Sequence, residues 1–199
     1  MLPATRYRTI LIFGAPGTGK GTQGKILNQI PGFVHVACGE VLRSLDLHSR
    51  LGKVFLEYSS KGEFVPDDIA IQLWRDYIDD LVQEKRFQPE IDYLLLDGIP
   101  RNLPQARAMD CHIDVRQIIY LRCQDPEVLV KRMKSRAHRE KRFDDVNEQV
   151  IRHRLEEYES QTAPTLSHYP PDLIQEIDAT DTPVGVLSEI TNAFRRVLS

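Results

Sequence analysis

The stretch TILIFGAPGTGKGTQ, residues 9–23, decides the fold. Its first five residues are β-branched or apolar, which is typical of a short strand buried on both faces of a parallel sheet. GAPGTGK fits the pattern G-x-x-x-x-G-K, and the residues from Lys20 onward predict a helix with Ile26, Leu27 and Ile30 on its inner face. Strand, glycine-rich loop and helix in this order are the context that a phosphate-binding loop requires.

This loop predicts a site for a nucleoside triphosphate, although a glycine-rich stretch outside such a context can be only a turn. The glycines let successive backbone N–H groups point into one concavity, and the helix N-terminus adds partial positive charge. Lys20 would reach the outer phosphates. The next residue is Gly21 rather than a hydroxyl-bearing residue, so Thr22, water and a carboxylate from elsewhere would serve a bound Mg²⁺.

Composition narrows the class of protein. A chain of 199 residues suffices for one domain, and a net charge of −3 gives no general attraction to nucleic acid or to anionic membranes. The three cysteines form no C-x-x-C pair, so reduced thiols in a cytosolic protein are expected. The apolar run after Arg8 stops at the glycine loop without the length or cleavage site of a signal peptide. We therefore expect a cytoplasmic protein with no nucleic-acid or membrane partner.

Four further apolar runs indicate buried strands, and they alternate with helical patterns. The strands are predicted at 33–37, 93–96, 117–121 and 173–177, and the helices at 51–60, 69–82, 104–109, 127–133, 146–161 and 184–197. This alternation predicts an α/β fold with a parallel sheet covered on both faces. Ligands bind beyond the carboxyl ends of such strands, so the loops after Phe13, Val36 and Leu96 should converge.

Candidate site residues follow the second and third strands. ACGEVLR carries Arg43 on a short helix, although a solvated arginine would look the same. In KGEFVP, residues 61–66, Gly62 is typical of the end of one helix and Pro66 of the start of the next. By itself this segment indicates only a boundary between two helices. LLLDGIPR ends the third strand with Asp97, a candidate magnesium-linked acid that could also simply cap a turn. Arg101 is then directed into the same cleft.

A basic run follows the fourth strand. Seven of the twelve residues 131–142 are Lys or Arg, which is typical of a solvated face or a nucleic-acid patch. The chain is acidic overall and the run holds no aromatic residue, so a clamp on polyphosphate is favoured. Arg132 and Arg136 share a helix face because they are four residues apart. Arg142 closes the run, and Arg154 follows on the next helix.

Together these pieces resemble the adenylate kinase family of nucleoside monophosphate kinases. The matching segments, in the family's order, are GAPGTGKGTQ, ACGEVLR, KGEFVP, DGIPRNLPQA, KRMKSRAHREKRFDD and IRHRLEEYESQTAP. The resemblance implies a P-loop NTPase fold of three αβα layers with a five-stranded parallel sheet in a single kinase domain. It divides that domain into a core of residues 1–37, 68–130 and 153–199, a helical monophosphate-binding insert of residues 38–67, and a short lid of residues 131–152.

The resemblance also implies a role for each matching residue. ATP would be bound by Gly17, Thr18, Gly19, Lys20, Gly21, Thr22, Arg132, Arg136 and Asp181, with Arg132 stacked on the base. AMP would be bound by Cys38, Arg43, Glu63, Phe64, Val65, Gly98, Arg101, Gln105, Arg142 and Arg154, with Gln105 reading the edge of the base. The catalytic residues would be Lys20, Arg101, Arg136, Arg142 and Arg154. Thr22 would bind Mg²⁺, and Asp97 would bind it through water.

The implied activity is the Mg²⁺-dependent interconversion of ATP and AMP with two ADP by a monomer. The attacking phosphate oxygen is already anionic and needs no base, so His35, His138 and His153 are expected to be structural or solvated. Cys38 stands where adenylate kinases usually carry Thr, which leaves a UMP/CMP kinase as an alternative, whereas Gln105 favours AMP. A GTP-driven switch is a more distant alternative, but the chain lacks N-K-x-D and D-x-x-G motifs. An inactive nucleotide-binding subunit is another alternative, and the full set of expected arginines argues against it.

Overall fold

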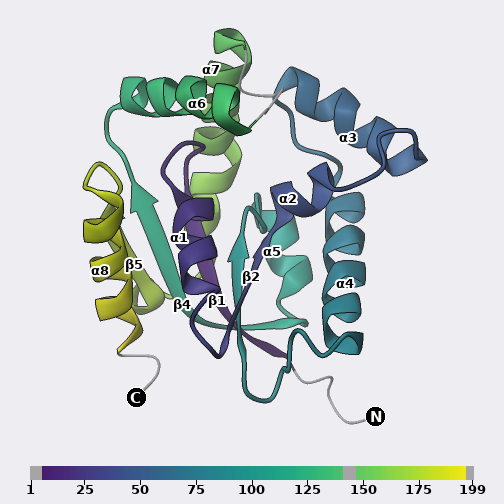
Figure 1. The fold of residues 1–199 in the computed structure, drawn as a ribbon, viewed down its shortest axis with the longest axis vertical. Helices are drawn as coiled ribbons and strands as arrows, with labels where there is room; N and C mark the ends of the chain where they lie inside the picture. The colour runs from purple at the N-terminus through teal and green to yellow at the C-terminus, as the bar shows by residue number, and fades with distance from the viewer. Residues whose placement is uncertain (1–5, 141–146, 196–199) are drawn as a thin grey trace.

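A five-stranded parallel sheet lies between two layers of helices in the computed structural model, which describes residues 6–140 and 147–195 (Figure 1). The strands are β1 (Tyr7–Gly14), β2 (Phe33–Ala37), β3 (Tyr93–Asp97), β4 (Ile113–Arg122) and β5 (Ile174–Asp178). Their order in the sheet is β2-β3-β1-β4-β5, and every neighbouring pair is parallel. The predicted α/β class is therefore confirmed.

The helices follow the predicted order. They are α1 (Lys20–Leu27), α2 (Cys38–Arg43), α3 (Arg50–Lys61), α4 (Asp67–Gln83), α5 (Leu103–Met109), α6 (Pro126–Glu140), α7 (Glu148–Glu157) and α8 (Pro183–Phe194). A π-helical turn, η2 (Tyr158–Thr162), extends α7 and is followed by the 3₁₀ turns η3 (Ala163–His168) and η4 (Pro171–Leu173). The predicted ends of these elements are shifted by a few residues, most of all in β4 and α6, which extend well beyond their apolar runs.

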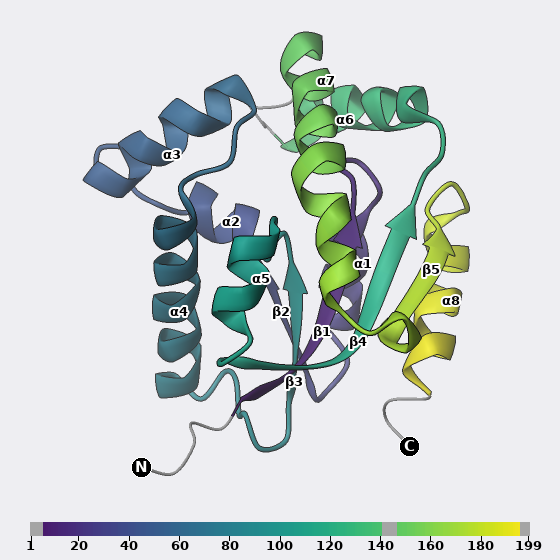
Figure 2. The same ribbon diagram turned by 180° about the vertical axis from the view of Figure 1, so that it is seen from behind.

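Both faces of the sheet are apolar because successive residues of a strand point to opposite sides. In β1, Ile10 and Ile12 pack with α1 and α8, whereas Leu11 and Phe13 pack with α2, α4 and α5. Figures 1 and 2 show α1 and α8 on the opposite face of the sheet from α4 and α5. Burial on both faces explains why the strands are continuous apolar runs rather than alternating ones.

The inner face of α1 differs from the prediction. Ile26 and Ile30 are 39% and 40% exposed, so the prediction was wrong for both and only Leu27 lies in the core. Helix α1 ends at Leu27, before Ile30. Its contact with β2 is made through Gly24, where a Cβ atom would lie 2.2 Å from Nε2 of His35. The close approach at this glycine turns the two isoleucines toward solvent.

The carboxyl ends of the strands point toward a region flanked by two groups of helices. α3 lies on one side of this region, and α6 with α7 lies on the other (Figure 2). α3 falls within the segment predicted as the insert, whereas α6 and α7 only overlap the predicted lid of residues 131–152, and that division stays a prediction. Within the described ranges, none of the helices combines the length and the apolarity that crossing a membrane demands.

The contact between α1 and β2 can be tested with Gly24→Ala. We expect the substitution to lower the free energy of unfolding by about 1–3 kcal/mol because the new methyl group overlaps the buried ring of His35. Urea unfolding can be followed by the fluorescence of Trp74, the one tryptophan of the chain, which is 2% exposed. In a His35→Ala background the same change should instead stabilise the protein, since alanine is the better helix former. An equal loss in both backgrounds would contradict the overlap.

Candidate functional site

A cleft of about 610 Å³ lies at the carboxyl ends of the strands. Its walls come from the loops that follow β1, β2, β3 and β5, from the segment after α3, and from α6 and α7. The predicted convergence of the loops after Phe13, Val36 and Leu96 is therefore confirmed, as expected for an open parallel sheet.

Most of the predicted site residues line this one cleft. They are Gly17, Thr18, Gly19, Lys20, Gly21, Thr22, Arg43, Glu63, Phe64, Val65, Asp97, Gly98, Arg101, Arg132, Arg136, Arg154 and Asp181. Cys38 and Gln105 are 5% and 1% exposed and are not among the lining residues. Arg142 lies outside the described residues. The structure thus brings the candidates together, and their individual roles stay predictions.

The phosphate loop begins at a position where only glycine fits. Gly14 has φ +149°, and a Cβ atom there would lie 2.6 Å from the carbonyl oxygen of Leu121 and 2.7 Å from Oγ1 of Thr18. The hydroxyl of Thr18 donates to the carbonyl oxygen of Ala15 at 2.9 Å and fixes the following turn. Gly19 precedes the first turn of α1 and provides no side-chain cap, so the amides of that turn are available to an anion.

The ammonium of Lys20 is held by this loop. Nζ donates to the carbonyl oxygens of Gly14 at 2.6 Å and of Ala15 at 3.3 Å. Burial lowers the pKa of Lys20 to about 8, against the opposing effect of Asp97. Three arginines, Arg136, Arg101 and Arg154, lower this pKa further. A bound polyphosphate would place negative charge beside the ammonium of Lys20.

Asp97 places a carboxylate beside the phosphate loop. It ends β3 beside Ile12 of β1 and is 9% exposed. A Cβ atom on Gly21 would lie 3.6 Å from its Oδ2, so the missing side chain leaves room in front of the carboxylate. Nε2 of His35 lies 3.9 Å from the same oxygen, and burial lowers the pKa of that imidazole. His35 is therefore a neutral packing partner of Asp97.

Arg101 is fixed from several directions. Its guanidinium lies 4.8 Å from the centroid of the Phe64 ring, a cation–π contact with the segment after α3. Nε donates to the carbonyl oxygen of Gly98 at 2.7 Å. The main-chain N–H donates to Oε1 of Gln105 at 2.8 Å, and the carbonyl oxygen accepts from Oγ1 of Thr162 at 2.8 Å. Arg101 and Phe64, predicted separately for the monophosphate site, thus lie in contact.

The amide of Gln105 is oriented by its own partners. Oε1 accepts from the main chain of Arg101, and Nε2 donates to Oδ1 of Asp67 at 2.7 Å. The same carboxylate oxygen accepts from Nδ2 of Asn102 at 2.8 Å. One N–H and one lone pair of Gln105 remain for other partners. Its role in reading a base edge stays a prediction.

The helices on the α3 side also join the cleft. Arg43 is the last residue of α2, and Gly62 ends α3 in the left-handed region at φ +81°, as the helix stop predicted. Pro66 caps α4 one position before its first helical residue. Nζ of Lys25 on α1 lies 2.7 Å from Oε1 of Glu40 on α2, and both residues line the cleft. This ion pair connects the phosphate loop's helix with α2.

The loop after β5 closes the cleft beside α1 and α6. Nη1 of Arg132 donates to the carbonyl oxygen of Ala179 at 2.7 Å, and Nε2 of Gln23 donates to that of Pro183 at 2.9 Å. Asp181 lies between these two anchor points in the chain and lines the cleft. Arg132 and Asp181, both predicted to bind ATP, are therefore brought to the same corner of the cleft.

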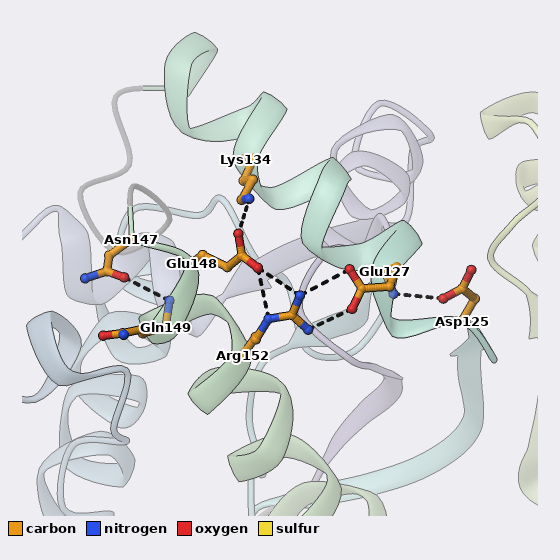
Figure 3. A network of polar contacts seen from close by, with 7 residues as sticks. All are labelled: Asp125, Glu127, Lys134, Asn147, Glu148, Gln149 and Arg152. Atoms are coloured by element: carbon orange, nitrogen blue, oxygen red, sulfur yellow. Dashed lines mark hydrogen bonds and ion pairs between the residues drawn. The ribbon is translucent and has the colours of Figure 1, made fainter.

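On their outer side, α6 and α7 are joined by a network of ion pairs (Figure 3). Arg152 of α7 donates to both carboxylate oxygens of Glu127, at 2.7 and 3.2 Å, and its Nε donates to Glu148 at 3.0 Å. Glu148 also pairs with Lys134 of α6. The bond from Arg152 holds the pKa of Glu127 below its usual range, and that from Lys134 does the same for Glu148. These pairs are exposed, so dissolved salt screens them.

An apolar cluster connects the same two helices to the phosphate loop. Its buried members are Ala15, Leu129, Val130, Met133, Ile151, Leu155 and Tyr158. A Cβ atom on Gly17 would lie 3.1 Å from the carbonyl oxygen of Leu129 and 3.2 Å from Cγ of Met133, so α6 packs directly on the loop. α6 and α7 therefore pack together, and α6 packs against the phosphate loop.

Several lining residues had not been predicted. They include Gln23, Lys25, Phe55, Ser59, Tyr158, Thr162 and Val186. Tyr158 and Thr162 lie four and eight residues after Arg154, and this helical spacing is the signal that could have indicated them. The others carry no comparable pattern, since they reach the cleft only through tertiary packing.

Comparison with known proteins shows the family of this chain. The family model described as Adenylate kinase matches residues 12–173. The chain belongs to the adenylate kinase family. It is similar to an adenylate kinase of Flavobacterium psychrophilum, 33% identical over 196 residues that cover 96% of this chain and 97% of the relative. A second, from Thermobifida fusca, is 36% identical over 188 residues, covering 92% of this chain and 93% of the relative. A third, from Synechococcus sp., is 36% identical over 192 residues, covering 93% of this chain and 97% of the relative.

For this member of the adenylate kinase family, the buried lysine predicts a pH dependence. An anion binds the protonated form of Lys20 more tightly, and the free protein loses that proton above a pKa of about 8. We expect the affinity for metal-free ATP, measured by calorimetry, to be highest near pH 7 and to fall as the pH rises through 8. The fall should not exceed about tenfold per pH unit, because one proton is involved. The phosphates of ATP are already ionised in this range.

The matched control is Lys20→Met. This variant should bind ATP more weakly at pH 7 and show no further decline above pH 8. A decline of the same size in both proteins would assign the titration to another group.

Proposed function

We propose that this chain transfers the terminal phosphoryl group of ATP to AMP and forms two ADP. The observation that carries the proposal is the charge of the cleft. A phosphate loop with a buried lysine faces arginines from four other segments, namely Arg43, Arg101, Arg136 and Arg154 with their neighbour Arg132. A cleft with so many guanidinium groups beside a phosphate loop suits two phosphate-bearing substrates together.

The mechanism follows from the charge of the substrates. The amides at the start of α1 and Lys20 would hold the triphosphate, while Arg43 and Arg101 would hold the monophosphate facing it. The attacking phosphate oxygen is already anionic, so positioning and charge stabilisation supply the catalysis and no side chain removes a proton. Arg136 and Arg154 would neutralise charge on the group in transfer. Exclusion of water would prevent loss of that group to hydrolysis.

Mg²⁺ is part of the proposal, and the residues present fit it. Asp97 offers one carboxylate beside the phosphate loop, with free space in front of it at Gly21. In the part of the chain that the structure describes, no three His, Cys, Asp or Glu side chains cluster as a metal cage. A single acid suits an ion that keeps several waters and binds mainly through phosphates. When bound, Mg²⁺ would offset the negative charge of the phosphates, and Asp97 and Thr22 would orient its water ligands.

AMP is the proposed acceptor, and a UMP/CMP kinase is not favoured. The three relatives described above are all named adenylate kinases. Gln105 supports an adenine base because its oriented amide keeps one donor and one acceptor. Cys38 is a small neutral group beside Gly98, and burial raises the pKa of its thiol. Assays with AMP, CMP, UMP and GMP in parallel test this choice, and a preference for a pyrimidine would overturn it.

We further propose a monomer in the cytoplasm, with residues 38–67 and 131–152 moving as insert and lid. The three free cysteines support the cytoplasmic assignment. Sedimentation of the purified protein with and without a bisubstrate inhibitor would test the monomer.

The proposed activity is tested by a coupled assay for ADP with MgATP and AMP. Wild type should form ADP, and Arg101→Ala should lose at least about 100-fold in kcat/KM for AMP because it removes a guanidinium from the phosphate site. Arg116→Ala is the control, since Arg116 pairs with Asp114 near the opposite end of β4 and should not matter. No ADP from the wild type would refute the function, whereas a normal Arg101→Ala enzyme would refute the site.

The metal is tested with Asp97→Asn. The amide keeps the shape of the carboxylate but loses its charge, so the Mg²⁺ concentration for half-maximal rate should rise and kcat should fall by about 10–100-fold. Unfolding followed by Trp74 fluorescence checks that the variant folds. A Mg²⁺ titration that matches the wild type would show that Asp97 does not serve the metal.

A further inference from the structure

Both main-chain polar atoms of Arg101 are held by buried side chains. The N–H donates to Oε1 of Gln105 and the carbonyl oxygen accepts from Oγ1 of Thr162, each at 2.8 Å. Gln105 is 1% and Thr162 is 7% exposed, so water competes little for either bond. The bond to Gln105 is local in the chain. That to Thr162 spans 61 residues and comes from a different element.

Thr162 ends the helical segment that carries Arg154. α7 continues without a break into the π-helical turn η2, and Arg154, Tyr158 and Thr162, spaced four residues apart, all line the cleft. Positions four apart in an α-helix drift slowly round its axis. The wider π turn, with its i→i+5 bonds, counters that drift and keeps the three side chains on one face. The segment therefore presents a cation and a hydroxyl to the same cleft.

Charge alone would not keep Arg101 and Arg154 close. Both lower the pKa of Lys20, so both act as positive charges on the same point. Like charges repel, so their shared charge gives Arg101 and Arg154 no attraction for each other. The hydroxyl of Thr162 acts on the main chain of Arg101 and does not depend on the charge of either guanidinium.

We infer that Thr162 is a positioning residue for the monophosphate. Its hydroxyl fixes the main chain of Arg101 relative to the helix of Arg154, so that Arg101 faces the monophosphate beside the guanidinium that faces the group in transfer. Thr162 need not touch the substrate. The inference rests on the proposed function, because it takes from it the role of Arg101 in binding AMP.

The test compares three variants with the wild type. Thr162→Val removes the hydroxyl but keeps the shape, and Thr162→Ser keeps the hydroxyl. Thr165→Val is the matched control, because Thr165 is 1% exposed and its hydroxyl donates to the carbonyl oxygen of Gln161 at 3.0 Å, without contact to Arg101. The dissociation constants for AMP and for ATP are measured by calorimetry, which needs no turnover.

Thr162→Val should bind AMP about tenfold more weakly, since it leaves a buried carbonyl without its donor, and should bind ATP within about twofold of the wild type. Thr162→Ser and Thr165→Val should keep the AMP affinity of the wild type. In an Arg101→Ala background, Thr162→Val should have no further effect on AMP, because the guanidinium that it positions is gone.

Two kinds of failure are distinguishable. Wild-type protein that binds no AMP overturns the proposed function. If the wild type binds AMP, the inference alone is overturned by any of three results: equal AMP affinity in Thr162→Val, equal losses for AMP and ATP, or a full effect of Thr162→Val without Arg101.

Discussion

The ammonium of Lys20 lies in the cleft, and its hydrogen bonds go to main-chain carbonyls of the phosphate loop. These carbonyls are in place because β1 ends in Gly14, a residue for which no Cβ would fit between Leu121 and Thr18. The order of the strands also places a negative charge close to Lys20. β1 lies between β3 and β4, so the last residue of β3, Asp97, falls beside the same loop. The carboxylate of Asp97 offsets only part of the positive charge around Lys20, so the site attracts a polyanion.

The rest of the site gathers further positive charge around that lysine, and each arginine with a described bond is held from behind by neutral groups. Arg101 is held by a phenyl ring, a carbonyl, an amide and a hydroxyl. Arg132 is held by the carbonyl of Ala179. Supports of this kind do not weaken the positive charge that faces the cleft, which carboxylate partners would do. Carboxylates are instead used on the outer side of α6 and α7, where Glu127 and Glu148 bind Arg152 (Figure 3).

Sequence patterns predicted the fold class and most of the lining because both depend on local signals. Apolar runs and a glycine-rich loop can be recognised from a few neighbouring residues. Asp97 and Arg101 could be assigned to the cleft because they come at, or shortly after, the end of a predicted strand. The outward turn of Ile26 and Ile30 could not be predicted, since it depends on the fit of Gly24 against a ring on β2. The support of Arg101 by Thr162 was equally inaccessible, because it joins residues 61 positions apart. Arg142 lies outside the described residues, so its predicted role stays open to experiment.

The packing of α6 on the phosphate loop has a mechanical consequence. Because Leu129 and Met133 press against Gly17, any swing of α6 pivots near this contact. Displacement grows with distance from a pivot. Arg132, next to Met133 and anchored to Ala179, would hardly move, whereas Arg136, one turn farther along, would travel more. On the predicted roles of these two arginines, such a lever would leave the contact with the base in place while it moves the outer guanidinium relative to the phosphates.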